Sequence, residues 1–174
     1  MDTADADPFD PLEATVEEVH AAMEGGETTA ESLVGTYLAR IEAYDGDLNA
    51  ILTVNPDARE RARELDAAFE AEGFVGPLHG VPVVLKDNKD THDMPTTAGS
   101  VALADSVPPE DAFVVEQLRD AGAVILAKAN LQEFAFGVDT ISSLGGETRN
   151  AYALDRRPSG SSGGTAAAIA ANLG

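Results

Sequence analysis

Two short apolar segments, joined by a stretch that contains one helix, limit this chain to a single fold class. The first is VPVVL, residues 81–85, which follows the turn sequence GPLHG and ends at Lys86. The second is AVILAK, residues 123–128. Strands that are apolar on both faces belong to sheets covered on both sides, and a strand–helix–strand order favours a parallel pair. The sequence therefore predicts an α/β fold.

The helix between these strands is predicted over about residues 111–120. The spacing of its apolar residues indicates one face that packs against the sheet. We expect that face to consist of Phe113, Val114, Gln117 and Leu118. A further short helix is expected at NLQEFAFG, residues 130–137.

Three helices are predicted ahead of this unit. The first begins with the capping-box pattern of Thr15 and Glu18. A second, longer helix begins with the same pattern at Thr28 and is expected to end at the Asp-Gly pair of residues 45–46. A third is expected to begin with Asn55 as its N-cap, ahead of a proline that suits the first helical position.

The sequence predicts one domain with an acidic tail. The tail covers residues 1–12, and residues 13–174 form the N-terminal part of a single domain. Within it, helices occupy about residues 15–72, and the sheet and a Gly/Ser-rich loop region occupy about residues 76–174. The closing segment TAAAIAANLG is expected to begin a helix that the end of the chain interrupts.

The net charge of the chain limits the classes of partner that it can bind. It has 31 acidic and 11 basic residues, a net charge of −20, so binding to nucleic acid or to anionic membranes is not expected. Salt screens the self-repulsion of such a surface, so we predict a halophilic protein, with an ordinary acidic protein as the alternative. No apolar run reaches the length of a membrane span and no signal peptide is visible, which predicts a cytoplasmic protein.

Lys86 is the first candidate for chemistry. It stands at the carboxyl end of a buried strand, where open α/β sheets usually hold their ligands. Burial there would lower the pKa of the amine, and a base near neutral pH needs a decrease of about 3 units. The alternative is a charged structural lysine whose side chain reaches water. Position alone leaves both interpretations open.

The segment PSGSSGG, residues 158–164, is the second candidate. A flexible linker is disfavoured because an alanine-rich helix follows directly. An anion site could form from backbone N–H groups at the helix start, although the lysine of a P-loop is absent. A serine site would need a base that takes a hydroxyl proton. The serines concerned are Ser159, Ser161 and Ser162.

Metal binding is not expected. The three histidines, His20, His79 and His92, lack the spacing of metal ligands. Three acids follow Lys86 closely: Asp87, Asp90 and Asp93. Acidic residues are frequent throughout the chain, so this group alone does not indicate a metal site. The absence of cysteine excludes thiol nucleophiles and cysteine-based zinc sites.

Four segments together resemble a known family. They are GPLHGVPVVLKDN, PTTAGS, DAFVVEQLRDAGAVILAKANLQEFAFG and PSGSSGGTAAA. In order and spacing they resemble the amidase signature family from about residue 28 to the last residue. The resemblance implies an α/β/α fold around a mixed central sheet, here incomplete and preceded by N-terminal helices. It also implies a small-molecule amide as substrate and no cofactor.

The same resemblance implies a Ser–cis-Ser–Lys triad that hydrolyses amides through an acyl-enzyme. Lys86 stands where the family has its catalytic lysine. Ser161 matches the bridging serine, whose peptide bond to the preceding glycine is cis and whose hydroxyl passes a proton from the nucleophile to the neutral lysine. The supporting residues of the loop are Gly160, Ser162, Gly163 and Gly164.

The family's nucleophilic serine follows the Ser-Ser pair at a distance that places it past Gly174. We therefore expect a chain truncated before the nucleophile, through a broken reading frame, a trimmed sequence or a natural short protein, and inactive by itself. Two positions depart from the family pattern. Ser159 stands where glycine is usual, and Ala151 where proline commonly follows Asn150.

Three functions remain open at this point. The first is a segment of an amide hydrolase. The sequence LQEFAFGVDTISSLGGETRN is more similar to stand-alone amidases than to amidotransferase subunits. The second is a glutaminase like the A subunit of a tRNA-dependent amidotransferase. The third is a non-catalytic acidic module whose Gly/Ser loop binds anions. A homodimer is a possible assembly.

Overall fold

A computed structural model describes residues 9–174, and residues 1–8 of the predicted acidic tail lie outside the described part. The central sheet consists of three strands in the order β1-β3-β2. Their bounds are β1 Ile51–Val54, β2 Pro82–Lys86 and β3 Val124–Ala129. β2 and β3 are parallel and β1 is antiparallel to β3, so the sheet is mixed and the fold is α/β, as predicted.

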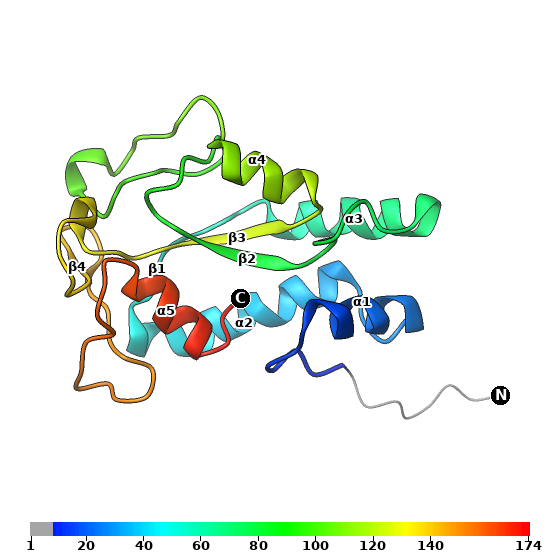
Figure 1. The fold of residues 1–174 in the computed structure, drawn as a ribbon, viewed down its shortest axis with the longest axis horizontal. Coiled ribbons are helices and arrows are strands. Elements are labelled where there is room, and N and C mark those ends of the chain that lie inside the picture. Colours follow the sequence, from blue (N-terminus) through cyan, green and yellow to red (C-terminus); the bar gives the residue numbers. More distant parts are fainter. Residues whose placement is uncertain (1–8) are drawn as a thin grey trace.

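Helices cover both faces of this sheet. The helices are α1 (Val16–Gly25), α2 (Ala30–Leu48), α3 (Ala58–Glu72), α4 (Phe113–Asp120) and α5 (Gly163–Ala170). α4 lies on one side, while α1, α2 and α5 lie on the other (Figure 1). The shorter elements are the 3-10 turns η1 (Val101–Leu103) and η2 (Glu133–Ala135) and the hairpin of β4 (Ile141–Ser142) and β5 (Gly146–Glu147). None of the helices within residues 9–174 is long and apolar enough to cross a bilayer.

A bulge sets which side chains face which helices. The pairing of β2 with β3 shifts by one residue between Val83 and Val84. Beyond the shift, Leu85 is beside Lys128 and Lys86 is beside Ala129. Because successive residues of a strand point to opposite faces, the side chains of Lys86 and Lys128 leave the sheet in opposite directions.

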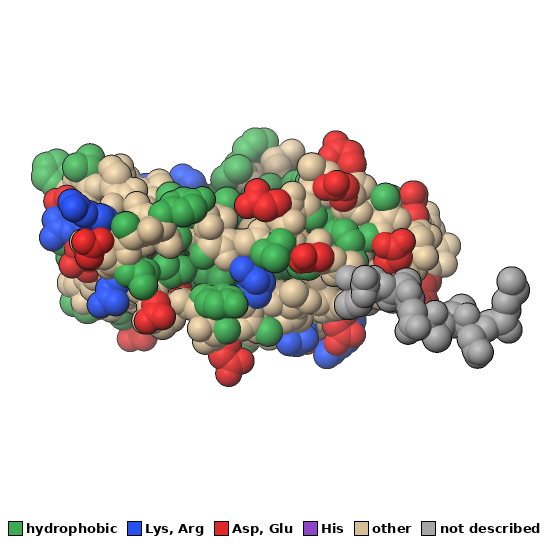
Figure 2. Space-filling view, turned by 90° about the horizontal axis from the view of Figure 1, so that it is seen from below, with side chains coloured by type: hydrophobic (Ala, Val, Ile, Leu, Met, Phe, Trp, Pro, Cys, Tyr) green, Lys and Arg blue, Asp and Glu red, His purple; other side chains and the backbone are tan. Residues whose placement is uncertain are grey.

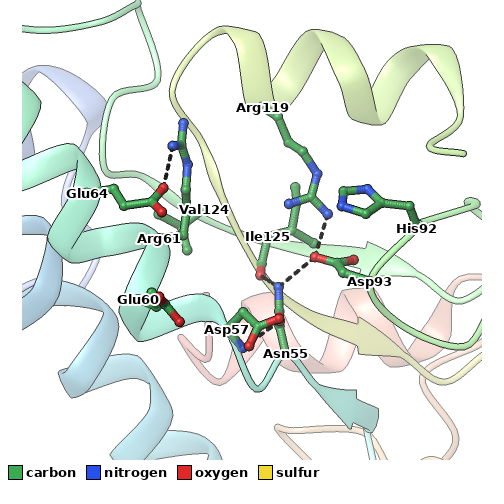
Figure 3. Close-up of a pocket in the computed structure, with 10 residues that line it drawn as sticks. All are labelled: Asn55, Asp57, Glu60, Arg61, Glu64, His92, Asp93, Arg119, Val124 and Ile125. Carbon is green, nitrogen blue, oxygen red and sulfur yellow. Dashed lines mark hydrogen bonds and ion pairs between the residues drawn. The ribbon is translucent and has the colours of Figure 1, made fainter.

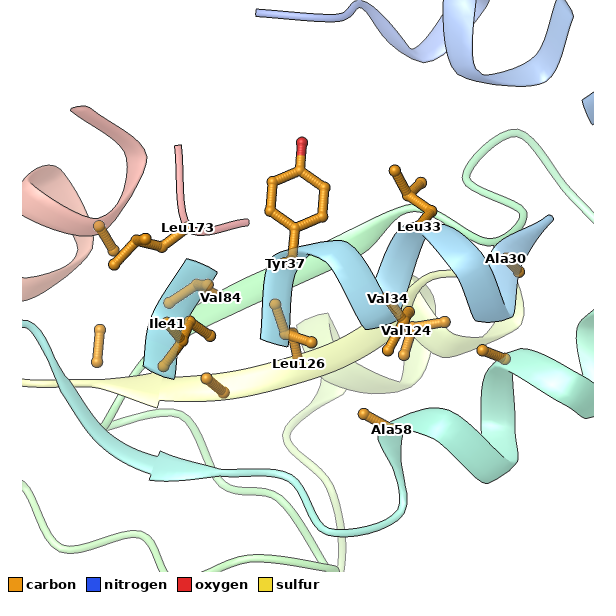
Figure 4. Close-up of a cluster of buried hydrophobic side chains, with 14 of the residues drawn as sticks. Ala30, Leu33, Val34, Tyr37, Ile41, Ala58, Val84, Val124, Leu126 and Leu173 are labelled. Atoms are coloured by element: carbon orange, nitrogen blue, oxygen red, sulfur yellow. The ribbon is translucent and has the colours of Figure 1, made fainter. Parts of the chain in front are cut away.

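The larger core fills the space between the sheet and helices α2 and α5 (Figure 4). Helices α1 and α3 also contribute to it, as do β2 and β3, and its side chains include Leu33, Val34, Tyr37, Ile41, Leu65, Val84, Val124, Leu126 and Leu173. A smaller core under α4 contains Leu85, Met94, Val115 and Ile125. Burial of apolar area on both faces explains why the two strands carry no alternating polar residues.

The predicted sheet-facing side of α4 was wrong for Phe113, Val114 and Gln117, whereas Leu118 packs against the core as predicted. Phe113 is 75% exposed and Val114 is 48% exposed, whereas Val115 is fully buried. The helix begins at Phe113 rather than near Asp111, and its packing turns Val115 and the partly buried Leu118 toward the sheet. Residues three apart share one helix face, so Val115 and Leu118 lie together on the buried face, and Phe113 and Val114 lie outside it.

The first helix begins with the predicted capping box, and both of its hydrogen bonds form. The second helix is capped by Thr29 and not by Thr28, since the Thr29 hydroxyl accepts the N–H of Ser32 at 3.1 Å. It also continues through residues 45–46 to Leu48. Its end is set by Asn49, which takes a left-handed conformation with φ of 54°.

The third helix begins at Ala58, and Asn55 is not its N-cap. The Asn55 side chain instead donates to the carbonyl of Ile125 at 2.8 Å and so ties this turn to β3. The last helix is not interrupted by the end of the chain. It ends at Ala170, after which Arg40 donates to the carbonyl of Asn172 at 2.7 Å and holds the closing residues against α2.

The acidic residues are distributed rather than gathered on the face that Figure 2 shows. Aspartate and glutamate side chains there alternate with basic and apolar ones. This distribution limits the repulsion between neighbouring carboxylates.

Candidate active site

The carboxyl end of β2 and the loop before α5 bring Lys86 and Ser161 together. Nζ of Lys86 donates a hydrogen bond to Oγ of Ser161 over 2.7 Å, and both side chains are half-buried. The peptide bond between Gly160 and Ser161 is cis, in agreement with what the resemblance implied. Two residues 75 positions apart in sequence thus form one polar contact on the α5 face of the sheet.

The surroundings of Lys86 favour its neutral form. Burial lowers the pKa of the amine below its ordinary value, and the positive charge of Lys89 acts in the same direction. The partner of Lys86 is a hydroxyl rather than a carboxylate, so this contact brings no negative charge that would hold the proton on the amine.

The glycines of the loop allow close packing. A side chain at Gly160 would come within 2.6 Å of the Thr140 hydroxyl, and one at Gly163 would collide with the same hydroxyl. At Gly164 a side chain would meet the backbone of Asn130, whose carbonyl accepts the Gly164 N–H at 3.1 Å. Ser162 is exposed and its hydroxyl makes no cap for α5.

A second buried lysine was missed by the sequence analysis. Lys128 of β3 is fully buried and forms an ion pair with the equally buried Asp87, with 3.0 Å between Nζ and Oδ1. Its ammonium also donates to Oγ1 of Thr96 at 2.8 Å and to the carbonyl of Pro95 at 3.1 Å. Burial lowers the pKa of Lys128, and the Asp87 carboxylate opposes this effect. The available signal was a lysine inside an otherwise apolar strand.

The acids after Lys86 lie apart in the structure. Asp87 pairs with Lys128, Asp90 is exposed, and Asp93 pairs with Arg119 of α4 at 2.7 Å. Asp93 lines a pocket of about 270 Å³ beside His92 and Arg119 (Figure 3).

His92, Asp93 and Asp111 offer ligand atoms within 4.8 Å of one another. The Arg119 guanidinium already pairs with both carboxylates, at 2.7 Å to Asp93 and 2.8 Å to Asp111. A cation at this point would compete with the guanidinium for the same oxygens, so the group fits an internal ion-pair network better than a metal site.

The remaining histidines lie away from Lys86. His79 is fully buried and its ring packs near Phe69 and Phe74, while Nε2 of His20 lies 3.1 Å from the His79 carbonyl oxygen. Both therefore belong to the junction of α1, α3 and the turn before β2.

Comparison with known proteins gives the family. A family model described as Amidase matches residues 32–174. The chain belongs to this amidase family. Its α/β fold with a mixed sheet agrees with that of solved family members.

Curated relatives include components of amidotransferases. The A subunit of the glutamyl-tRNA(Gln) amidotransferase of Thermobifida fusca is 50% identical over 161 residues, covering 92% of this chain and 32% of that protein. Its counterpart in Halorhodospira halophila is 47% identical, covering 91% of this chain and 33% of that protein. The chain thus spans about a third of the length of these relatives.

Solved structures include amidases. The native peptide amidase from Stenotrophomonas maltophilia matches with a TM-score of 0.89 and 44% identity, over 92% of this chain and 34% of that one. An amidase family protein from Bacillus anthracis matches with a TM-score of 0.86 and 37% identity, over 93% of this chain and 34% of that one.

Proposed function

We propose that Lys86 and Ser161 form the proton-relay part of an amide-cleaving site. The 2.7 Å contact between Nζ of Lys86 and Oγ of Ser161 carries this proposal. In the relay, the neutral amine of Lys86 accepts this hydrogen bond instead of donating it: Ser161 receives a proton from a nucleophilic serine while its own hydroxyl proton passes to Nζ of Lys86. The activated serine attacks the amide carbonyl to form an acyl-enzyme, the proton returns to the leaving amine, and water releases the acid.

The electrostatics of the site support Lys86 as the base. An amine accepts a proton only when it is neutral, and burial lowers the pKa of Lys86 in that direction. Within residues 9–174, no carboxylate forms an ion pair with Lys86, because the adjacent Asp87 is directed to Lys128 on the other face. The relay lysine is thereby kept free of a permanent counter-ion.

The nucleophilic serine and the donors that stabilise the oxyanion belong, in this proposal, to sequence outside these 174 residues. Two observations support this part of the proposal: the spacing implied by the family resemblance, which extends past Gly174, and the length of the relatives, about three times that of the matched segment. The substrate of the complete site is a small-molecule amide, and the proposal includes no cofactor or metal.

A glutaminase of the amidotransferase type is the second candidate. The observation in its favour is the 50% identity to the amidotransferase component of Thermobifida fusca, against 44% to the Stenotrophomonas maltophilia peptide amidase. Both candidates use the same relay and differ in substrate and in their need for partner proteins.

A pair of hybrid proteins tests the relay and separates the candidates. In the first, residues 9–174 replace the matching third of the Stenotrophomonas maltophilia peptide amidase. In the second, they replace the matching third of the Thermobifida fusca amidotransferase component, which is assayed together with the other proteins of its complex. We expect amide hydrolysis in at least one hybrid. The candidate whose hybrid retains more of its parent's activity is favoured.

The relay residues are then substituted in the active hybrid. Lys86→Met and Ser161→Ala should each lower kcat by at least about a hundredfold, the lower range for loss of general acid–base catalysis. Arg59→Met and Ser32→Ala, at exposed positions on α3 and α2, are the matched controls and should keep activity within a few-fold. Near-normal turnover in either relay variant would contradict the proposal.

A further inference from the structure

Thr140 stands out among the residues around the Ser161 loop. Its side chain is fully buried, although it follows a segment of exposed residues that includes Phe136 and Val138. Its backbone has a φ of 56°, a left-handed conformation that is rare for a β-branched residue. Such a conformation persists only where its surroundings enforce it, and it concentrates at functional sites.

The Thr140 hydroxyl spans the loop that carries Ser161. Oγ1 donates to the carbonyl of Ser159 at 2.6 Å, two residues before Ser161. The same oxygen accepts the N–H of Gly163 at 3.1 Å, two residues after it. One hydroxyl therefore satisfies a carbonyl and an N–H on either side of the relay serine, and both of its hydrogen-bonding functions are used.

The glycines of the loop are shaped around this hydroxyl. The space at Gly160 and at Gly163 that a side chain would fill is occupied by Oγ1 of Thr140. A neighbouring contact, from the N–H of Gln132 to the carbonyl of Ser161 at 3.0 Å, holds the serine backbone from the same side. The loop thus bends over the segment around residues 132–140, with the threonine hydroxyl inside the bend.

We propose that Thr140 is a positioning residue, whose hydroxyl fixes the bend of residues 159–163 and so directs Oγ of Ser161 toward Lys86. The inference rests on the proposed function, in which Ser161 carries the proton between a nucleophile and Lys86. The hydroxyl of Thr140 is bonded to the carbonyl of Ser159 and the N–H of Gly163, so its effect on Ser161 is transmitted through these two backbone hydrogen bonds.

The chain offers a direct readout of this geometry because it contains only three lysines: Lys86, Lys89 and Lys128. Labelling the lysine side chains with ¹³Cε and ¹⁵Nζ gives one NMR signal for each. The Lys86 signal reports its contact with Ser161, and the Lys128 signal reports whether the buried pair with Asp87 is intact.

Two variants separate the hydroxyl from the volume of the side chain. Thr140→Val keeps the shape and leaves the Ser159 carbonyl and the Gly163 N–H without a partner, whereas Thr140→Ser keeps the hydroxyl. We expect the valine variant to shift the Lys86 signal and move its titration toward that of an ordinary lysine, as water enters, while the Lys128 signal stays. The serine variant and the control Thr36→Val, on the exposed side of α2, should match the parent chain.

Unchanged Lys86 shift and titration in a folded Thr140→Val variant would overturn the proposal. If that variant does not fold, hydrogen exchange of the unmodified chain decides. The Gly163 N–H should be protected by at least about a hundredfold over an unstructured amide, and exchange at the unstructured rate would overturn the proposal.

Activity distinguishes this inference from the proposed function. In the active hybrid, Thr140→Val should lower kcat about a hundredfold with KM nearly unchanged, as expected for displacement of a reacting group, and Thr140→Ser should restore it. Failure of the proposed function has a different signature, since Lys86→Met and Ser161→Ala would then keep turnover whatever Thr140 does.

Discussion

Lys86 and Lys128 lie near the carboxyl ends of neighbouring parallel strands, yet their surroundings differ. Lys86 is half-buried on the α5 face, and its amine forms a hydrogen bond of 2.7 Å with the hydroxyl of Ser161. Lys128 is fully buried on the α4 face and meets the Asp87 carboxylate at 3.0 Å. In the proposed relay the Lys86 amine exchanges a proton, whereas the Lys128 amine keeps an ion pair.

The difference depends on a single aspartate. Asp87 directly follows Lys86, but strand alternation directs it to the other face, where it pairs with Lys128. The same carboxylate accepts the N–H of Thr97 at 3.1 Å, which fixes the loop after β2. The fold thus uses the Asp87 carboxylate for structure, and no carboxylate within residues 9–174 forms an ion pair with Lys86.

The largest expected effect comes from breaking the buried pair. Asp87→Ala leaves the charge of Lys128 buried without its ion-pair partner. Lys128→Met leaves the Asp87 carboxylate buried without its partner. Each should lower the free energy of unfolding by about 3–5 kcal/mol, measured by urea denaturation. Glu64→Ala, which breaks the exposed pair with Arg61, is the control and should cost at most about 1 kcal/mol. A loss that small for either member of the buried pair would contradict its structural role.

The second-largest effect is expected from acid, which should lower the free energy of unfolding through Asp111 on the α4 side of the sheet. Burial acts to raise the pKa of Asp111, but hydrogen bonds from His92 and the charge of Arg119 outweigh it and hold the pKa below its ordinary value. Stability from this group is therefore present above the unfolded pKa of about 3.9 and is lost as the pH falls through the lower folded value. Asp111→Asn should reduce the difference in unfolding free energy between pH 6 and pH 3. An unchanged difference would contradict the assignment.

The smallest effect on stability is expected at Lys86. Replacing it by methionine removes a desolvated amine whose partner, the Ser161 hydroxyl, still reaches water. Lys86→Met should therefore change the free energy of unfolding by less than about 1 kcal/mol, in either direction, in the same urea experiment. A loss as large as that of Lys128→Met would show that the two lysines do not have separate roles.

The sequence allowed much of the scaffold to be predicted. Apolar strands around one helix define the parallel pair, and the threonine–glutamate pattern marks the start of α1. β1 was missed because it has only four residues between two helices. The buried face of α4 was assigned wrongly because the exposed Phe113 is as apolar as the buried Val115, and only packing separates them.

Less of the candidate active site could be predicted from the sequence. Lys86 and Ser161 could each be named as candidates, but their contact joins residues far apart in sequence and was expected only from the family resemblance. The pairing of Lys128 with Asp87 depends on the bulge between Val83 and Val84, which breaks simple alternation along the strands. The position of Thr140 depends on a left-handed backbone that its residue type disfavours.

The most direct test of the account is the titration of Lys86 by NMR in the lysine-labelled chain. We expect the pKa of Lys86 to lie below the ordinary lysine value of about 10.4, because burial disfavours the charged amine. It also predicts that Ser161→Ala changes the Lys86 signal and leaves that of Lys128 in place. A Lys86 that titrates at or above the ordinary value, and whose signal does not respond to loss of the Ser161 hydroxyl, would contradict its role as the base of the relay.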